Sequence, residues 1–403
     1  MILTSNCSSA VAGVFARFSR CGRAVASLLL MAAFAVGGVD ASAQTLSPAP
    51  ATNTSVRNEV RHAIDKGLAW LEKNQDTNGS WSSPDHPAMT ALVLQAFEGR
   101  PDRDPKSEPA AVTKGYAFLM SCVQPDGGIY RKELPSYNTS VGLMAVVLRH
   151  RPEDQAVIAG ARKFLIGLQT ESGDPESPFN GGIGYGAGDR QPDLSNTEMA
   201  LEALYYSKRA AESKDLAGPD LNWKAAIHFI QSCQNLPAYN SEKWASDDAQ
   251  NKGGFVYAPG HSMAGETNLP SGHVALRSYG SMGYAGMLSY AYADLKPDDP
   301  RVTAVNDWLR ANYSVDENPV MGLQGVYYYY FVMAKALTLK GHDLLITADG
   351  KTVNWREQLA LKLINLQAAD GSWTNSDGRW WEKDPSLDTA FTLIALDQIG
   401  RDL

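Results

Sequence analysis

One carboxyl group in this sequence has the surroundings of a catalytic acid. Asp388 opens the segment Asp388-Thr389-Ala390 and comes shortly after the aromatic pair Trp380 and Trp381. A carboxyl group held against tryptophan side chains can have a raised pKa and then act as a proton donor. Aspartate is also a preferred helix N-cap, because its side chain accepts a backbone N–H at a helix start. The sequence therefore leaves Asp388 two interpretations, a catalytic acid or a cap.

Other polar and aromatic side chains stand at the starts of apolar segments elsewhere in the chain. Asp193 comes just before Ser195 and Asn196 in such a segment, and it is either a ligand-binding residue or a cap or turn residue. Tyr327 begins a run of four tyrosines. Four successive helix positions span about 300°, so we expect only one or two of these side chains to face a cavity. The predicted substrate-binding residues are Asp193, Asn138, Arg277, Tyr279, Tyr284, Tyr327, Trp380 and Trp381, and the same helix starts also bring Asp85, His86, Tyr137 and Asn196.

Pairs of helices are the elements that would position these side chains. Five segments share a pattern in which a helical stretch is followed by a glutamine and then by a Gly-rich turn with an aromatic residue. The glutamines are Gln75, Gln124, Gln169, Gln231 or Gln234, and Gln367, and a degenerate copy runs from Val305 to Tyr327. The first gaps between the glutamines have the length of two helices and two turns, which is typical of stacked helical hairpins.

The second helix of each pair differs from the first. It begins with small or polar residues and is then apolar on nearly every side, as in Leu92–Phe97. A helix that is apolar all round must be buried all round. The first helix carries more charged residues and therefore belongs outside. An inner ring of apolar helices within an outer ring predicts an all-α fold, an α/α toroid of about six helical hairpins, as one domain over 58–403.

The N-terminal segment has the features of a secretory signal peptide. These features are a basic region at Arg17, Arg20 and Arg23, an uncharged apolar run over 25–39, and a small-x-small site at 41–43. The apolar run is shorter than the ~20 residues of a membrane-spanning helix, although an anchor that stays attached is the alternative. We expect a signal peptide over 1–43, a flexible linker over 44–57, and a secreted or periplasmic mature chain without a transmembrane segment.

Charge and residue spacing exclude several partners. The formal net charge is −8, whereas surfaces that bind nucleic acid are basic. The seven histidines have none of the spacings typical of a zinc site, so we expect no metal and no cofactor. Two cysteines follow the predicted signal, Cys122 and Cys233, and they either form one disulfide or are buried thiols. The sequence does not predict an oligomeric state.

Two of the corners between helices resemble a known family. The string from Lys66 to Trp81, Lys-Gly-x-x-aromatic-Leu-x3-Gln-x3-Gly-x-Trp, is similar to the Gln-Trp repeat of squalene and hopene cyclases, and Asp370–Trp373 matches the end of that repeat. The Gly-Gly-aromatic turns are similar to those of protein prenyltransferase β-subunits. The resemblance extends over about 58–400. It implies an α/α toroid whose central cavity takes an apolar, isoprenoid-like molecule or lipid, and it implies that the Gln and Trp residues bond and cover helix ends.

The motifs that carry the chemistry of that family are missing. The cyclases use an Asp-x-Asp-Asp cluster, and here Asp247-Asp248 and Asp298-Asp299 lack the preceding aspartate. The prenyltransferases hold Zn²⁺ partly through Asp-x-Cys. In this chain Met120 and Gln231 stand two residues before the cysteines instead.

Three functional hypotheses follow. An enzyme, or degenerate enzyme, for an apolar isoprenoid-like molecule predicts a large cavity lined by aromatic and Met side chains, with one buried acid such as Asp388. A polysaccharide-degrading toroid predicts an open polar cleft with Arg277 and paired carboxylates. A non-catalytic binding or scaffold protein predicts a filled or narrow centre, with Asp388 and Asp193 bonded as caps.

Overall fold

The computed structural model describes residues 54–101, 103–104, 107–186, 191–210, 220–341, 344–401 and 403. The predicted signal peptide over 1–43 lies outside these residues, as does 44–53 of the predicted linker. Within the described residues the chain is mostly helical, with four short strands. No helix in this part of the chain is long and apolar enough to cross a membrane.

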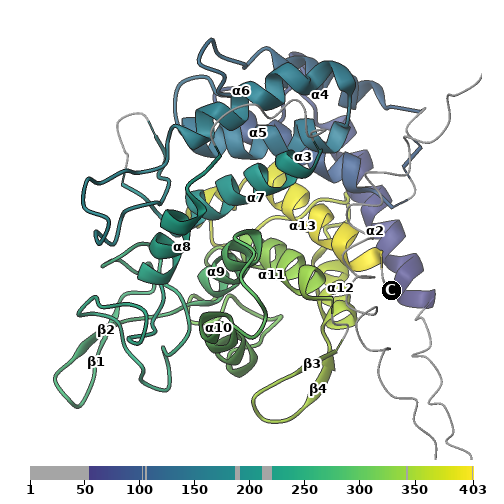
Figure 1. The fold of residues 1–403 in the computed structure, drawn as a ribbon. Coiled ribbons are helices and arrows are strands. Elements are labelled where there is room, and N and C mark those ends of the chain that lie inside the picture. The colour runs from purple at the N-terminus through teal and green to yellow at the C-terminus, as the bar shows by residue number, and fades with distance from the viewer. Residues whose placement is uncertain are drawn as a thin grey trace, which may run out of the picture.

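Within the described residues, six helices form an inner ring and six form an outer ring (Figure 1). The inner helices are α3 (Pro87–Gly99), α5 (Pro135–Arg149), α7 (Leu194–Ala210), α9 (Gly280–Tyr292), α11 (Val326–Lys340) and α13 (Pro385–Gly400). The outer helices are α2 (Thr54–Lys73), α4 (Ala110–Met120), α6 (Gln155–Ile166), α8 (Trp223–Ser232), α10 (Pro300–Ala311) and α12 (Trp355–Leu366).

The two rings are closed. Each inner helix packs on the next one along the chain, and the last, α13, packs on the first, α3. Helix α2 contacts both α12 and α13, so the outer ring also joins its two ends. The predicted all-α toroid is therefore confirmed.

Burial explains which helix lies inside. Helix α3 buries every residue from Pro87 to Phe97, because it has helices on both sides, an outer helix behind it and the interior in front. Helix α2 buries one stripe, from Val56 through Val60, Ile64 and Leu71, and leaves its other face in solvent. This is the amphipathic spacing expected of an outer helix.

The tryptophans at the corners cover helix ends. The indole Nε1 of Trp81 donates to the carbonyl of Leu71 at 2.7 Å, in the last turn of α2. Trp373 does the same to Leu363 of α12 at 2.8 Å. Both side chains are fully buried. Each indole therefore satisfies a carbonyl that a helix terminus leaves unpaired.

The glutamines join neighbouring helix pairs. Gln75 Nε2 donates to the carbonyl of Gly79 in its own turn at 3.0 Å and to Ala111 of the next outer helix at 2.8 Å. Gln367 makes the corresponding bonds to Gly371 at 3.0 Å and to Ala63 of α2 at 2.9 Å, which links the end of the ring to its start. The same pair of bonds is made by Gln169 and Gln234. Gln124 bonds only within its own turn.

Two hairpins and two short 3₁₀ helices complete the described elements. Strands β1 (Glu266–Asn268) and β2 (Val274–Leu276) pair antiparallel between α8 and α9, and β3 (Leu344–Ile346) and β4 (Thr352–Asn354) pair between α11 and α12. The 3₁₀ helices are η1 (Pro152–Asp154) and η2 (Arg379–Trp381). Both hairpins project from the rings (Figure 1). Of the two interpretations of the cysteines, the structure has buried free thiols at Cys122 and Cys233.

Replacing the glutamine that closes the ring should destabilise the fold. Gln367→Leu should lower the free energy of unfolding by about 1–2 kcal/mol, because two partly buried carbonyls lose their donor. Urea unfolding followed by circular dichroism measures this change. Gln250→Leu, at an exposed position, is the matched control and should leave the value within about 0.5 kcal/mol of the wild type. Equal stability of the two variants would contradict the proposed closing role.

Candidate functional site

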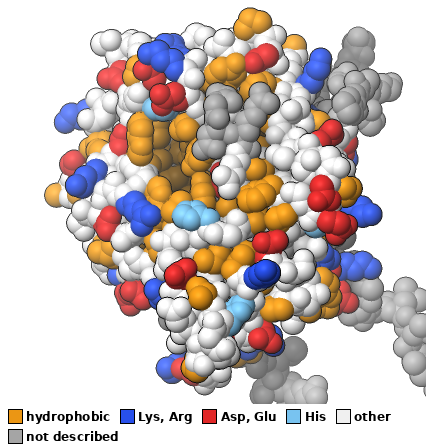
Figure 2. Space-filling view, turned by 90° about the vertical axis from the view of Figure 1, so that its left-hand side faces the viewer, with side chains coloured by type: hydrophobic (Ala, Val, Ile, Leu, Met, Phe, Trp, Pro, Cys, Tyr) orange, Lys and Arg blue, Asp and Glu red, His pale blue; other side chains and the backbone are white. Residues whose placement is uncertain are grey.

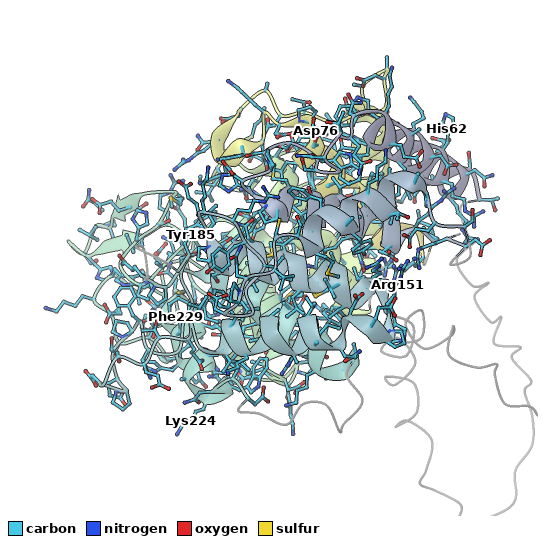
Figure 3. All side chains as sticks on the ribbon, turned by 90° about the horizontal axis from the view of Figure 1, so that it is seen from above. His62, Asp76, Arg151, Tyr185, Lys224 and Phe229 are labelled. Carbon is cyan, nitrogen blue, oxygen red and sulfur yellow. The ribbon has the colours of Figure 1, made fainter. Side chains whose placement is uncertain are left out.

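The N-terminal ends of the inner helices gather at one end of the toroid, which we call the mouth. Tyr185, shortly before α7, lies on the left of Figure 3, whereas Arg151, just after α5, lies on the right, so the two ends of the toroid are distinct. Hydrogen bonds join the segments before successive inner helices: Asn138 with Ala88 (2.9 Å), Ser136 with Tyr185 (3.1 Å), Leu194 with Tyr257 (2.8 Å), Gly280 with Pro319 (3.0 Å), Asn375 with Leu323 (2.7 Å), and Ser82 with Asp384. These bonds hold the rim in one arrangement.

Half-buried tyrosines line the mouth. Tyr137, Tyr185, Tyr257 and Tyr328 come from four different parts of the chain and are each of intermediate exposure. The hydroxyl of Tyr257 donates to that of Tyr185 at 3.3 Å, and the hydroxyls of Tyr328 and Ser195 are 3.4 Å apart. Figure 2 looks onto the left-hand side of Figure 1 and shows hydrophobic side chains around a hollow. Four phenol groups therefore gather at the mouth of the toroid.

Asp388 lies in the first turn of α13 and is fully buried. Its Oδ2 accepts the backbone N–H of Asn375 at 2.7 Å, and its Oδ1 has no hydrogen-bond partner among the described residues. Burial, with a smaller contribution from the charge of Glu382, raises the pKa of Asp388 to about 9. The helix cap is Asp384, which accepts the N–H of Ser386 at 2.8 Å. Asp388 is therefore a buried, uncharged acid at neutral pH and not the N-cap.

Glu382 completes the network around Asp388. Its Oε1 accepts the backbone N–H of Tyr328 at 2.8 Å, and its Oε2 accepts the side-chain amide of Asn375 at 2.7 Å. Burial raises the pKa of Glu382 to about 7, although these bonds oppose the shift. The sequence reasoning missed Glu382 and Asn375, because neither stands at a helix start. Tyr327 lies close enough for the charge of Asp388 to raise the pKa of its hydroxyl further, after burial.

The two tryptophans were expected to pack against Asp388, but the structure exposes them to solvent. Trp380 and Trp381 are 41% and 51% exposed and both have positive φ. Trp381 packs edge-on against His86 at 4.8 Å, and Arg379 lies over Trp380 at 4.3 Å. The raised pKa of Asp388 therefore comes from burial and from Glu382 rather than from these indoles.

Asp193 and Asn138 act as braces at the rim. Asp193 Oδ1 accepts the backbone N–H of Asn196 at 2.9 Å and its Oδ2 accepts the side-chain amide of Asn196 at 2.7 Å, as in a cap. Burial raises the pKa of Asp193 to about 7 against these bonds and one from Tyr257. Asn138 accepts from Ala88 and donates to the carbonyl of Glu133 at 2.8 Å, so its amide ties α5 to α3.

The remaining predicted residues divide between the mouth and the packing layer. Tyr279 is buried at the start of α9, where burial and then the charge of Asp193 raise the pKa of its hydroxyl. Arg277 donates to the carbonyl of Ala264 at 3.4 Å within the segment of β1 and β2, and no described carboxylate pairs with it. Tyr284 packs against Tyr329 at 5.7 Å, between α9 and α11, and is not part of the group around Asp388.

The interior below the mouth holds an acid that the sequence reasoning passed over. Glu198, on α7, is fully buried, and neither of its oxygens has a hydrogen-bond partner among the described residues. Burial, opposed by Lys335 and reinforced by Glu202, raises the pKa of Glu198 to about 8. The signal was present in the sequence, since Glu198 and Glu202 are four residues apart in a segment predicted to be an inner helix, and so lie on one face of it.

The space deeper in the ring is narrow. The gap that Gln95, Met144, Glu202 and Phe331 help to line, between α3, α5, α7 and α11, does not admit a water molecule. No group of His, Cys, Asp and Glu among the described residues is arranged to hold a metal ion. At the level of Glu202 the interior of the ring therefore has no room for a ligand.

Comparison with known proteins identifies the fold. No family model and no curated protein matches the sequence. A variant of the type II terpene cyclase MstE from Scytonema, in complex with the product merosterolic acid A, is similar with a TM-score of 0.54 and 11% identity, over 87% of this chain and 100% of that chain. The apo enzyme has a TM-score of 0.51 and 13% identity, over 86% and 99%. At this identity the likeness shows the fold alone, the α/α toroid of such enzymes.

Two further solved structures are similar to this chain. A variant of MstE in complex with its substrate geranylgeranyl dihydroxybenzoate has a TM-score of 0.52 and 13% identity, over 87% of this chain and 100% of that chain. A glycosidase has a TM-score of 0.46 and 11% identity, over 87% and 99%. That score is too low to support an argument about this chain.

The buried acid at position 388 should make stability depend on pH. The pKa of Asp388 is about 9 in the fold, against its ordinary value of 3.8, so the native state holds a proton that the unfolded state releases between these values. Stability therefore falls as pH rises through this window. Asp388→Asn lacks this penalty. The free energy of unfolding of Asp388→Asn minus that of the wild type should rise by on the order of 2–4 kcal/mol between about pH 5 and pH 8. Urea unfolding at the two pH values measures this difference.

The control is Asp85→Asn, at a half-exposed carboxylate paired with Lys132. Its difference from the wild type should change little over the same pH range. A pH-independent difference for Asp388→Asn would show that Asp388 is ionised in the fold.

Proposed function

We propose that this chain binds an apolar, isoprenoid-like molecule in the mouth of the toroid, with Asp388 as its candidate catalytic acid. The observation that carries the proposal is an uncharged, buried carboxyl group whose Oδ1 has no partner among the described residues, in the first turn of an inner helix at the mouth. Figure 2 shows an apolar hollow on one face of the molecule. An apolar hollow with a few polar groups is the usual form of a small-molecule site. The similarity in fold to a terpene cyclase in complex with geranylgeranyl dihydroxybenzoate supports the same class of ligand.

The chemistry open to Asp388 is proton transfer to a double bond. The proton leaves Asp388, a C–H bond forms on one alkene carbon and a cation develops on the other. The N–H of Asn375 already bonds Oδ2 and would stabilise the carboxylate that remains. Tyrosine faces attract a cation. Loss of a proton from the product cation to water would end the reaction, and return of a proton from water to Asp388 would restore the acid.

A non-catalytic binding or scaffold protein is the second candidate. It is favoured by the narrow interior and by the cap-like bonds of Asp193 and Glu382 to backbone N–H groups. A polysaccharide-degrading toroid has less support, because Arg277 does not join the paired carboxyls Asp388 and Glu382. The proposed enzyme and the non-catalytic binding protein differ in whether a bound molecule changes chemically.

Extraction of the purified protein separates them. Organic extraction and mass spectrometry should recover an apolar isoprenoid-like molecule from the wild type. Asp388→Asn should retain the molecule and convert it at least about 100-fold more slowly, because general acids contribute factors of that size. Glu171→Gln, at an exposed glutamate, should behave as the wild type does. Binding without any conversion in either protein would support the non-catalytic candidate, and an empty extract with no effect of Asp388→Asn would contradict both the ligand and the acid.

We also propose that the chain is exported and that the signal peptide is removed. The basic region, apolar run and small-x-small site of the first residues support this proposal. N-terminal sequencing of the protein from its native compartment should begin at Gln44. A chain that starts at Met1 and sediments with membranes would instead show a retained anchor.

A further inference from the structure

Glu198 lies between two contacts that cross the interior. Helices α7 and α11 are not neighbours in the ring, because α9 lies between them. They nevertheless meet through Ser195 and Tyr328 near the mouth, and through an ion pair of Glu202 with Lys335 deeper in. Glu198 is three residues after Ser195 and four before Glu202, so the three side chains share one face of α7. The carboxyl group of Glu198 therefore faces the interior between the two contacts.

The contact above Glu198 is the weaker of the two. The hydroxyls of Ser195 and Tyr328 are 3.4 Å apart, which is long for a hydrogen bond between hydroxyls. Both residues are only half-buried and belong to the mouth. The deeper contact joins two opposite charges, and Glu202 also accepts the hydroxyl of Tyr292 at 3.3 Å. A molecule that enters from the mouth would have to displace the Ser195–Tyr328 contact before it reached Glu198. The ion pair of Glu202 with Lys335 would then lie beneath its leading end.

The charges around Glu198 decide which end group fits. Lys335 is the cation beside it and is already paired with Glu202. Burial raises the pKa of Glu198 although Lys335 lowers it, with a smaller contribution upward from Glu202, and so favours the protonated form. A phosphate or carboxylate would lie beside the charge of Glu202, and an ammonium group would lie beside Lys335. A protonated carboxyl offers one donor and one acceptor, and an alcohol offers the same pair in return.

We infer that Glu198 selects an apolar molecule whose leading end carries an uncharged hydroxyl group. This inference deepens the proposed function and rests on it. The hydroxyl would satisfy both unpaired oxygens of Glu198, one as donor and one as acceptor, without burying a new charge. The apolar body would extend from Glu198 back to the tyrosines of the mouth.

A matched set of isoprenoids on one carbon skeleton tests the end group. Farnesol, farnesene, farnesylamine and farnesyl phosphate are titrated into the mature chain, and the dissociation constants are measured by isothermal titration calorimetry. Farnesol should bind about tenfold more tightly than farnesene, the hydrocarbon, and more tightly than the amine or the phosphate. Equal affinity for farnesol and farnesene, or tightest binding of a charged member, would overturn the inference.

Two variants assign the preference to Glu198. Glu198→Gln keeps a donor and an acceptor and should keep the preference for farnesol within about threefold. Glu198→Met keeps the length of the side chain and removes both groups, so farnesol and farnesene should bind alike while the affinity for farnesene is unchanged. Glu171→Met, at an exposed glutamate, is the control and should bind as the wild type does. A preference for farnesol that survives Glu198→Met would refute the role of Glu198.

The possible outcomes distinguish a failure of the inferred hydroxyl preference from a failure of the proposed apolar ligand. Binding of none of the four compounds would overturn the proposed apolar ligand, and the inference with it. Binding of all four with one affinity would leave the proposed function and overturn the inference alone. If Glu198→Met does not fold, the comparison of farnesol with farnesene on the wild type still decides whether a hydroxyl end group is preferred.

Discussion

Closure of the inner ring is the constraint on which the rest of this structure depends. Helix α13 packs on α3, and Gln367 bonds the carbonyl of Ala63, so no inner helix is left with a free side. A polar side chain on such a helix cannot reach solvent by turning outward. It must be bonded in place, as Asn138 is, or lose its charge, as Asp388 and Glu198 do.

Helix dipoles and burial act in opposite directions on the pKa of an acid at the mouth. Helix N-termini favour negative charge, by about 0.3–1 kcal/mol each and up to ~2 kcal/mol when partly buried. One pKa unit corresponds to about 1.4 kcal/mol, and the pKa of Asp388 rises from 3.8 to about 9. Burial therefore outweighs the dipole of α13 several times over. Asp388 therefore stays neutral at the mouth, where the dipole of α13 alone would favour a carboxylate.

The sequence predicted the fold better than the site, for a physical reason. Corner residues such as Gln75 and Trp81 keep a fixed spacing because they close the same turn, and that spacing can be read directly. An inner helix that is apolar on every side has no stripe to show which residues face inward. Tyr284 therefore points into the packing layer although it looked like a lining residue, and Glu198 faces the interior although its segment resembled an ordinary helix start. The network of Glu382 and Asn375 depends on a loop whose shape no periodicity encodes.

The two neutral acids, Asp388 and Glu198, differ in their hydrogen bonds, and this difference would orient a bound ligand. Asp388 has one oxygen held by the N–H of Asn375, so its proton belongs on the free Oδ1 and can be given up to a stabilised carboxylate. Glu198 accepts no hydrogen bond from the described residues that would stabilise its ionised form, and burial outweighs the attraction of Lys335, so it is suited to hold a hydroxyl and not to release a proton. Under the proposed function, a ligand anchored by its polar end at Glu198 would place its apolar body toward the mouth, where Asp388 lies. Recognition and proton transfer would then belong to different carboxyl groups, on two inner helices of one ring.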